Sequence, residues 1–173
     1  MGREPRTIAA TALSATAFAP FGWLPVADTD PADGDHRLQF AWEDPHVNVI
    51  SHSREEMLQV AGAICCDKMF RHLSHTQALL VLDNPSVLAV APPEVDFSEE
   101  GGIETVRAFR LAPHDSFVLH RGTWHWGPFP LGVEPVHLYN VQGLRYVDDN
   151  ESADLTRFDL WVETDHVEDD HQA

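Results

Sequence analysis

Residues Asp115–Trp126 read DSFVLHRGTWHW, a short apolar run that leads into two histidines, an arginine, a glycine and two tryptophans. An apolar run that ends near a glycine, with Gly127 and Pro128 just beyond, is typical of two strands joined at a turn. We therefore expect His120 and His125 to flank a strand turn. So many polar and aromatic side chains at one turn indicate a functional site.

A second polar cluster lies earlier in the chain. Residues Arg71–Gln77 read RHLSHTQ, and they run directly into the apolar segment Ala78–Leu82. Two polar clusters at the ends of predicted strands indicate one shared site.

Most of the remaining chain has the pattern of short strands separated by Pro, Gly and Asp turns. The expected strands are His36–Trp42, Val47–Ser51, Ala78–Leu82, Ser86–Ala91, Thr105–Leu111, Ser116–Leu119, Pro135–Val141 and Leu155–Val162. Eight strands predict a mainly β domain, either a barrel or a jelly roll. A helix is expected where Ser53 and Glu56 can form a capping box ahead of apolar residues at helical spacing, Met57, Val60, Ala61 and Ile64.

Composition narrows the class of protein. The chain has 173 residues, 43% of them hydrophobic, which suits one globular domain. Its net charge is −17 and Lys68 is its single lysine, so a polyanion would be repelled and nucleic acid is not an expected partner. Cys65 and Cys66 are adjacent, a spacing that rarely suits a disulfide, and this favours a reducing, cytoplasmic location.

Arg3 and Arg6 ahead of residues 8–19 resemble the start of a secretory signal peptide, but Thr, Ser and Pro interrupt the apolar segment that such a peptide needs. We also expect no membrane span, because no segment is long and apolar enough. The aspartate-rich segment 27–35 lacks the glycine and glutamate of a helix-loop-helix calcium site and is expected to be a solvated loop. Residues 1–162 are expected to form one domain, and 163–173 an acidic, solvated tail.

Two sets of motifs resemble known families. Phe70, His72 and Gln77 occupy the His, His and Glu slots of the first cupin motif, and Gly122 with His125 match the end of the second. A closer resemblance is to the ureidoglycolate lyase family. It rests on the phrases AFAPFG at 17–22, Arg71-His72 with Gln77-Ala78, RAF at 107–109 and RGTWH at 121–125, in the same order and spacing.

That resemblance implies a cupin-like β-barrel with one or two short helices, usually a cytoplasmic homodimer. The implied reaction splits ureidoglycolate into glyoxylate and urea in allantoin and purine catabolism. Two positions depart from the family pattern, because Phe70 stands where a glutamate usually precedes the arginine and Trp126 replaces a second histidine. Both departures remove polar groups from the expected site.

The reaction needs a base for the hydroxyl proton and an acid for departing urea, and imidazole serves for both. We expect His72 and His125 to act as acid, base or metal ligand, with His120 a further catalytic candidate. Gln77 can bond the ureido amide. Arg121 is expected to bind the carboxylate, with Arg71 or Lys68 in its place, and Trp124 to line the substrate site.

A divalent metal could be held by His72, Gln77 and His125, with His75 as a substitute fourth ligand. Nickel, zinc and manganese are not distinguished by such a set. Two alternatives to the lyase stay open. One is a metal-dependent cupin acting on another small hydroxy or keto acid, and the other is a barrel that binds a small acid without catalysis.

Overall fold

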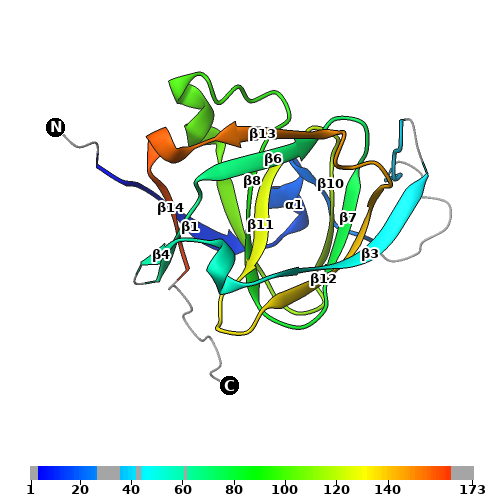
Figure 1. The fold of residues 1–173 in the computed structure, drawn as a ribbon, viewed down its shortest axis with the longest axis horizontal. Helices are drawn as coiled ribbons and strands as arrows, with labels where there is room; N and C mark the ends of the chain where they lie inside the picture. Colours follow the sequence, from blue (N-terminus) through cyan, green and yellow to red (C-terminus); the bar gives the residue numbers. More distant parts are fainter. Residues whose placement is uncertain (1–3, 27–35, 42–43, 61, 165–173) are drawn as a thin grey trace.

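The computed structural model describes residues 4–26, 36–41, 44–60 and 62–164. They form two curled sheets that face each other around a common interior (Figure 1). The expected mainly β, cupin-like barrel is thus confirmed. The strands are β1 Arg6–Ala12, β2 Gly22–Trp23, β3 Pro45–His52, β4 Gln59–Val60, β5 Ala63–Cys65, β6 Lys68–His72, β7 Gln77–Val81, β8 Ser86–Ala91, β9 Arg107–Leu111, β10 Ser116–Leu119, β11 Trp124–Pro130, β12 Val136–Gly143, β13 Asn150–Asp154 and β14 Leu160–Glu163. The helices are α1 Ala15–Phe18 and the 3-10 turns η1 Arg54–Glu56, η2 Glu100–Thr105 and η3 Thr156–Phe158.

The larger sheet has the order β13-β6-β11-β8-β9-β1-β14-β5-β4, and the smaller has the order β2-β10-β7-β12-β3. Most pairs are antiparallel, but β1 runs parallel to both β9 and β14. All six residues of β8 are buried, because this central strand is covered on both faces. Val87, Ala89 and Ala91 belong to one apolar cluster, while Leu88 and Val90 belong to the other.

The cluster between the two sheets is closed by α1. Phe18, on α1, is fully buried and makes edge contacts with Phe109 and Phe117 at ring distances of 5.4 and 5.6 Å. The short helix is held at its start by Ser14, whose hydroxyl accepts from the Ala17 amide. Position 22, shortly after the helix, requires glycine, because a Cβ there would collide with the backbone oxygen of Val118 on β10. The family phrase at 17–22 is therefore packed into the domain.

Several predicted elements differ from those observed. The capping box of Ser53 and Glu56 is present, but it begins only the single turn η1. The chain then forms the antiparallel pair β4–β5, with Gly62 at φ 80° in the turn between them, so the predicted helix was wrong. Leu155–Val162 is interrupted by η3 before β14 begins at Leu160.

The predicted strand His36–Trp42 is reduced, within the described residues, to one bridge between Phe40 and His75. Trp42 and Ala61, the aspartate-rich segment 27–35 and the tail from 165 lie outside the described residues. Glu163, assigned above to the tail, still pairs with β5 as the last residue of β14.

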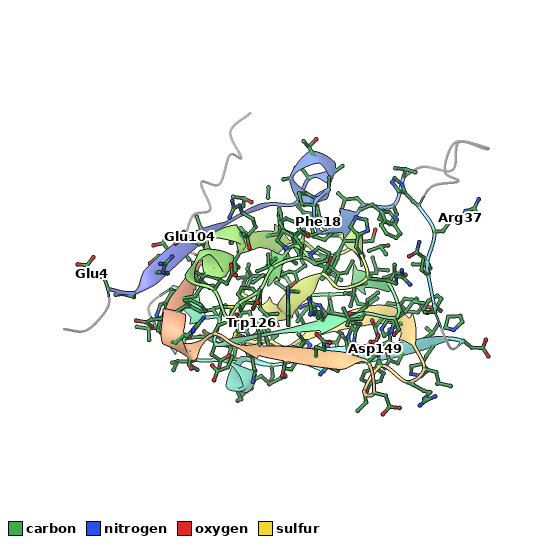
Figure 2. The ribbon with its side chains drawn as sticks, turned by 90° about the horizontal axis from the view of Figure 1, so that it is seen from above. Glu4, Phe18, Arg37, Glu104, Trp126 and Asp149 are labelled. Carbon is green, nitrogen blue, oxygen red and sulfur yellow. The ribbon has the colours of Figure 1, made fainter. Side chains whose placement is uncertain are left out.

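Figure 2 shows which labelled residues lie toward each end of the domain. Glu4 and Glu104 lie toward one end, whereas Arg37 and Asp149 lie toward the other, and Trp126 lies between them within the packed interior. No helix of the described segments is long and apolar enough to cross a membrane.

Candidate functional site

A cavity of about 320 Å³ opens between the sheets, where β6, β7, β11, β12 and β3 meet the segment 146–150. Strand alternation explains how β6 contributes to it. Lys68, Phe70 and His72 are two residues apart, so they share one face of the strand, and all three line the cavity. Phe70 pairs with His125 of β11, which brings the second histidine to the same wall. The two polar clusters therefore meet, as the sequence predicted.

Three imidazoles lie together here. The ring centroids of His72 and His75 are 4.6 Å apart, and those of His72 and His125 are 5.5 Å apart. Burial lowers the pKa of His72 to about 3, with repulsion from His125 and His75 adding to the effect. Burial likewise lowers the pKa of His125 to about 4. Both rings are therefore neutral at pH 7, the form in which a ring nitrogen can accept a hydrogen bond or bind a metal.

The tautomer of His125 follows from its surroundings. Its Nδ1 lies 3.1 Å from the backbone oxygen of Thr123, and a carbonyl oxygen can only accept. Nδ1 therefore carries the hydrogen, which leaves a lone pair on Nε2. His72 donates to the backbone of Asp149, and its Nδ1 has no hydrogen-bond partner among the described residues. Each of the two imidazoles thus has one ring nitrogen with a lone pair to offer.

Gln77 is held by a buried amide network. Its Nε2 donates to Asn140 Oδ1 at 2.9 Å and to Gln142 Oε1 at 3.3 Å. Asn140 in turn donates to Asn48 Oδ1 at 2.8 Å. Because both hydrogens of the Gln77 amide are used, its Oε1 is the group left over, and it has no partner in the described part of the chain. Gln77 consequently offers an acceptor to the cavity that it lines.

Asp149 is a site residue that the sequence did not reveal. Its carboxylate accepts from the backbone amides of Leu73 and Ser74 and from the Ser74 hydroxyl, at 2.8 to 3.2 Å. The same carboxylate lies 3.2 Å from Nδ1 of His75, and both side chains are almost fully buried. Asp149 thereby ties the loop 73–75 to the start of β13.

The donor set fits a divalent metal. Ligand atoms of His72, His75 and Asp149 all lie within 4.8 Å of one another. His72 Nδ1 and Gln77 Oε1 are buried acceptors without a described partner, as expected of ligands. Nitrogen and oxygen donors of this mixture suit zinc, nickel or manganese. Of the predicted ligands, His72, Gln77 and His125 line the cavity, whereas His75 lies behind His72, beside Asp149.

The other predicted residues lie elsewhere. Arg71 is the strand neighbour of His72 on β6, so its side chain lies on the opposite face of the strand. Its guanidinium lies 4.2 Å from the centroid of the Trp124 ring and 2.7 Å from the carboxylate of Glu151. Arg71 and Trp124 line a separate hollow of about 650 Å³. His120 and Arg121 line a third, of about 440 Å³. Lys68 is the one predicted cation in the lining of the histidine cavity.

The model of the ureidoglycolate lyase family matches residues 32–162, three quarters of the chain and all of the cavity lining. The chain belongs to the ureidoglycolate lyase family. It matches no curated protein.

Two solved structures resemble this member of the ureidoglycolate lyase family at low identity. A dTDP sugar isomerase from Desulfovibrio desulfuricans G20 is 12% identical, with a TM-score of 0.43, over 76% of this chain and 73% of its own. An oxalate decarboxylase is 13% identical, with a TM-score of 0.39, over 78% of this chain and 28% of its own. The chain thus spans only about a quarter of the decarboxylase.

Proposed function

We propose that the protein is a ureidoglycolate lyase, which cleaves ureidoglycolate to glyoxylate and urea. The observation that carries the proposal is the convergence of His72, His125 and Gln77 on one small cavity in a chain of this family. All three residues come from the motifs that carried the resemblance.

The reaction needs little more than the movement of one proton. A base removes the proton of the hydroxyl group, the oxygen forms the carbonyl of glyoxylate, and the C–N bond breaks with its electron pair going to nitrogen. The nitrogen then takes up one proton and leaves as urea. Since the hydroxyl and the nitrogen sit on the same carbon, a single imidazole can accept the first proton and return it. We assign this role to Nε2 of His125, which holds a lone pair.

The remaining groups position the substrate. Lys68 can bind the carboxylate, and Gln77 Oε1 can accept from an N–H of the ureido group. Because Nε2 of His125 is then engaged in proton transfer, a divalent metal would be held by His72 with His75 and Asp149, and it would supply Lewis acidity toward the substrate oxygens.

A different small hydroxy or keto acid is the second candidate substrate. Phe70 and Trp126, the two departures from the family pattern, both line the cavity. They make its wall more apolar than a glutamate and a histidine would, which favours a less polar substituent than the ureido group. A panel of hydroxy and keto acids, assayed beside ureidoglycolate, separates the two reactions.

We further propose a cytoplasmic homodimer. The free thiols of Cys65 and Cys66 suit a reducing compartment. β3 is the edge strand of the smaller sheet, and its Val49, 58% exposed, pairs with Tyr139, 43% exposed. An edge strand with exposed apolar side chains is suited to cover by a second copy. Light scattering of the purified protein measures the oligomeric state.

Purified protein should be assayed with racemic ureidoglycolate, metal-stripped and metal-restored, following glyoxylate, urea and ammonia. The proposal expects equal amounts of glyoxylate and urea, formed faster than by spontaneous breakdown, and no ammonia. His125→Asn should abolish this excess, whereas His114→Asn, at an exposed turn, should retain it. Ammonia release would indicate hydrolysis of the ureido group instead, and no turnover would leave the non-catalytic binding barrel.

A further inference from the structure

The capping box of Ser53 and Glu56 makes a second contact, one that the short turn η1 does not require. Glu56 Oε1 accepts from the Ser53 backbone amide at 2.7 Å, as a capping box demands. The other oxygen, Oε2, lies 2.8 Å from Nδ1 of His52, the last residue of β3. One carboxylate thus holds the start of the turn and the ring of His52 together, and this fixes its position beside the ring.

His52 lines the histidine cavity, although it lies outside the motifs that carry the family resemblance and outside the cluster of metal donors. Ile50 and His52 are two residues apart on β3 and both line the cavity, whereas Ser51 between them is exposed. The His52 ring lies 5.0 Å from the ring of Phe129 on β11, so it reaches from the smaller sheet to the larger one. Its side chain is 26% exposed, which lets it exchange protons with water.

Glu56 carries a negative charge at pH 7. Burial opposes its ionisation, but hydrogen bonds from the His52 ring and from the Ser53 amide outweigh that effect and hold the pKa of Glu56 below its ordinary value. An ionised carboxylate can only accept a hydrogen bond, so Nδ1 of His52 carries the hydrogen of this pair. Nε2 is therefore the nitrogen of His52 that can exchange a proton with a bound molecule.

The imidazoles of His52 and His125 have partners of different charge. Nδ1 of His125 lies 3.1 Å from the neutral backbone oxygen of Thr123, whereas Nδ1 of His52 lies against the Glu56 carboxylate. A carboxylate stabilises an imidazolium much more than a neutral carbonyl oxygen does. Two titratable groups whose surroundings favour opposite protonation states are the arrangement expected of an acid and a base. His52 is the one of the two that is suited to act as the acid.

We infer that His52 is the catalytic acid of the proposed lyase reaction and that Glu56 is its positioning residue. The inference rests on the proposed function, and it divides between two imidazoles the proton movement assigned above to one. Nε2 of His125 accepts the hydroxyl proton, the C–N bond breaks with its electron pair going to nitrogen, and Nε2 of protonated His52 donates a proton to that nitrogen. His125 then loses one proton to water and His52 regains one from water, which restores both rings.

The test compares kcat and KM for ureidoglycolate among variants, beside their urea unfolding. His52→Gln should lower kcat by about a hundredfold, with KM changed by less than about threefold. Glu56→Gln keeps a side chain that can complete the capping box and removes only the charge, so it should lower kcat by about tenfold without shifting the unfolding midpoint. Glu55→Gln removes the same charge from the exposed neighbour on the same turn and should match the native sequence.

Rescue by imidazole separates proton transfer from packing. Added imidazole should restore part of kcat to His52→Ala and should leave the native sequence unchanged. The inference is overturned if His52→Gln and Glu56→Gln turn over as fast as the native sequence, if they raise KM alone, or if Glu55→Gln lowers kcat as much as Glu56→Gln. It is also overturned if imidazole restores nothing to a folded His52→Ala.

These outcomes distinguish the inference from the proposed function. Native turnover that is insensitive to His52 and Glu56 would overturn the inference and leave the lyase reaction standing. Product formation by the native sequence at the spontaneous rate would overturn both.

Discussion

Acidification should destabilise this protein through its two buried neutral histidines. An unfolded chain binds a proton at each imidazole near pH 6.5, whereas folding lowers the pKa of His72 to about 3 and that of His125 to about 4. Between the pKa of each folded-state histidine and pH 6.5, the unfolded state binds more protons than the folded state. The free energy of unfolding therefore falls as the pH falls through this range. Above pH 6.5 both states hold neutral rings and the effect vanishes.

The size of the effect follows from the width of the window. A pH of 5 is about 1.5 units below the pKa of an imidazole in the unfolded chain. This difference lowers the free energy of unfolding by about 2 kcal/mol per histidine, or about 4 kcal/mol for the pair. A domain of this size is stable by roughly 5 to 15 kcal/mol, so the loss is a large share of the total.

Urea unfolding of chelator-treated protein at pH 7, 6 and 5 measures the loss. His125→Asn removes one of the two titrating rings, so its loss between pH 7 and pH 5 should be about 2 kcal/mol smaller than that of the native sequence. His114→Asn, at an exposed position, should lose as much as the native sequence. Equal losses for His125→Asn and the native sequence would refute the assignment of a buried, neutral His125.

Four further substitutions test other parts of the structure. Gly22→Ala should cost about 2 to 3 kcal/mol in urea unfolding, because its Cβ meets the Val118 backbone oxygen, and a cost below 0.5 kcal/mol would contradict the packing of β2 on β10. Phe18→Ala should cost about 3 to 5 kcal/mol by the same measurement, since the ring is fully buried. Gln77→Leu should lower kcat/KM for ureidoglycolate by about ten- to a hundredfold, and an unchanged value would remove the amide from substrate binding. Val49→Glu should shift the mass seen by light scattering from dimer to monomer; an unchanged dimer would place the interface elsewhere.

The fold could be predicted largely because strands have a local signature. Ser86–Ala91 and Ser116–Leu119 coincide with β8 and β10, since apolar runs bounded by turn residues need no distant information. The helix expected after Ser53 failed for the opposite reason. Its capping box is real, but β5 pairs with β14, from the far end of the chain, and this tertiary pairing outweighs the local helical spacing.

The site was predicted in part. The motif spacing correctly predicted that His72, Gln77 and His125 lie close together. They do so because β6, β7 and β11 all border the same cavity. Strand parity could have separated Arg71 from His72 at the outset, since neighbours on a strand face opposite sides. Asp149 left no local signal, because its role depends on contacts with a loop more than 70 residues earlier in the chain.

The hydrogen-bond direction of Gln77 could not be predicted from the sequence. Gln77, Asn140 and Asn48 come from three strands, and only their pairing across the smaller sheet shows that the Gln77 amide hydrogens are already used. From the sequence, this side chain could equally donate or accept. Its hydrogen bonds in the folded chain make it an acceptor, which gives its proposed contact with the ureido N–H a direction.

The most direct test of the proposed reaction is the simultaneous measurement of glyoxylate and urea from ureidoglycolate, with the native sequence and His125→Asn compared at pH 7. The expected result is equal formation of the two products, well above the spontaneous rate, and its loss in the variant. Product formation at the spontaneous rate with both proteins, in metal-stripped and metal-restored samples alike, would contradict the assignment of the histidine cavity as a lyase site.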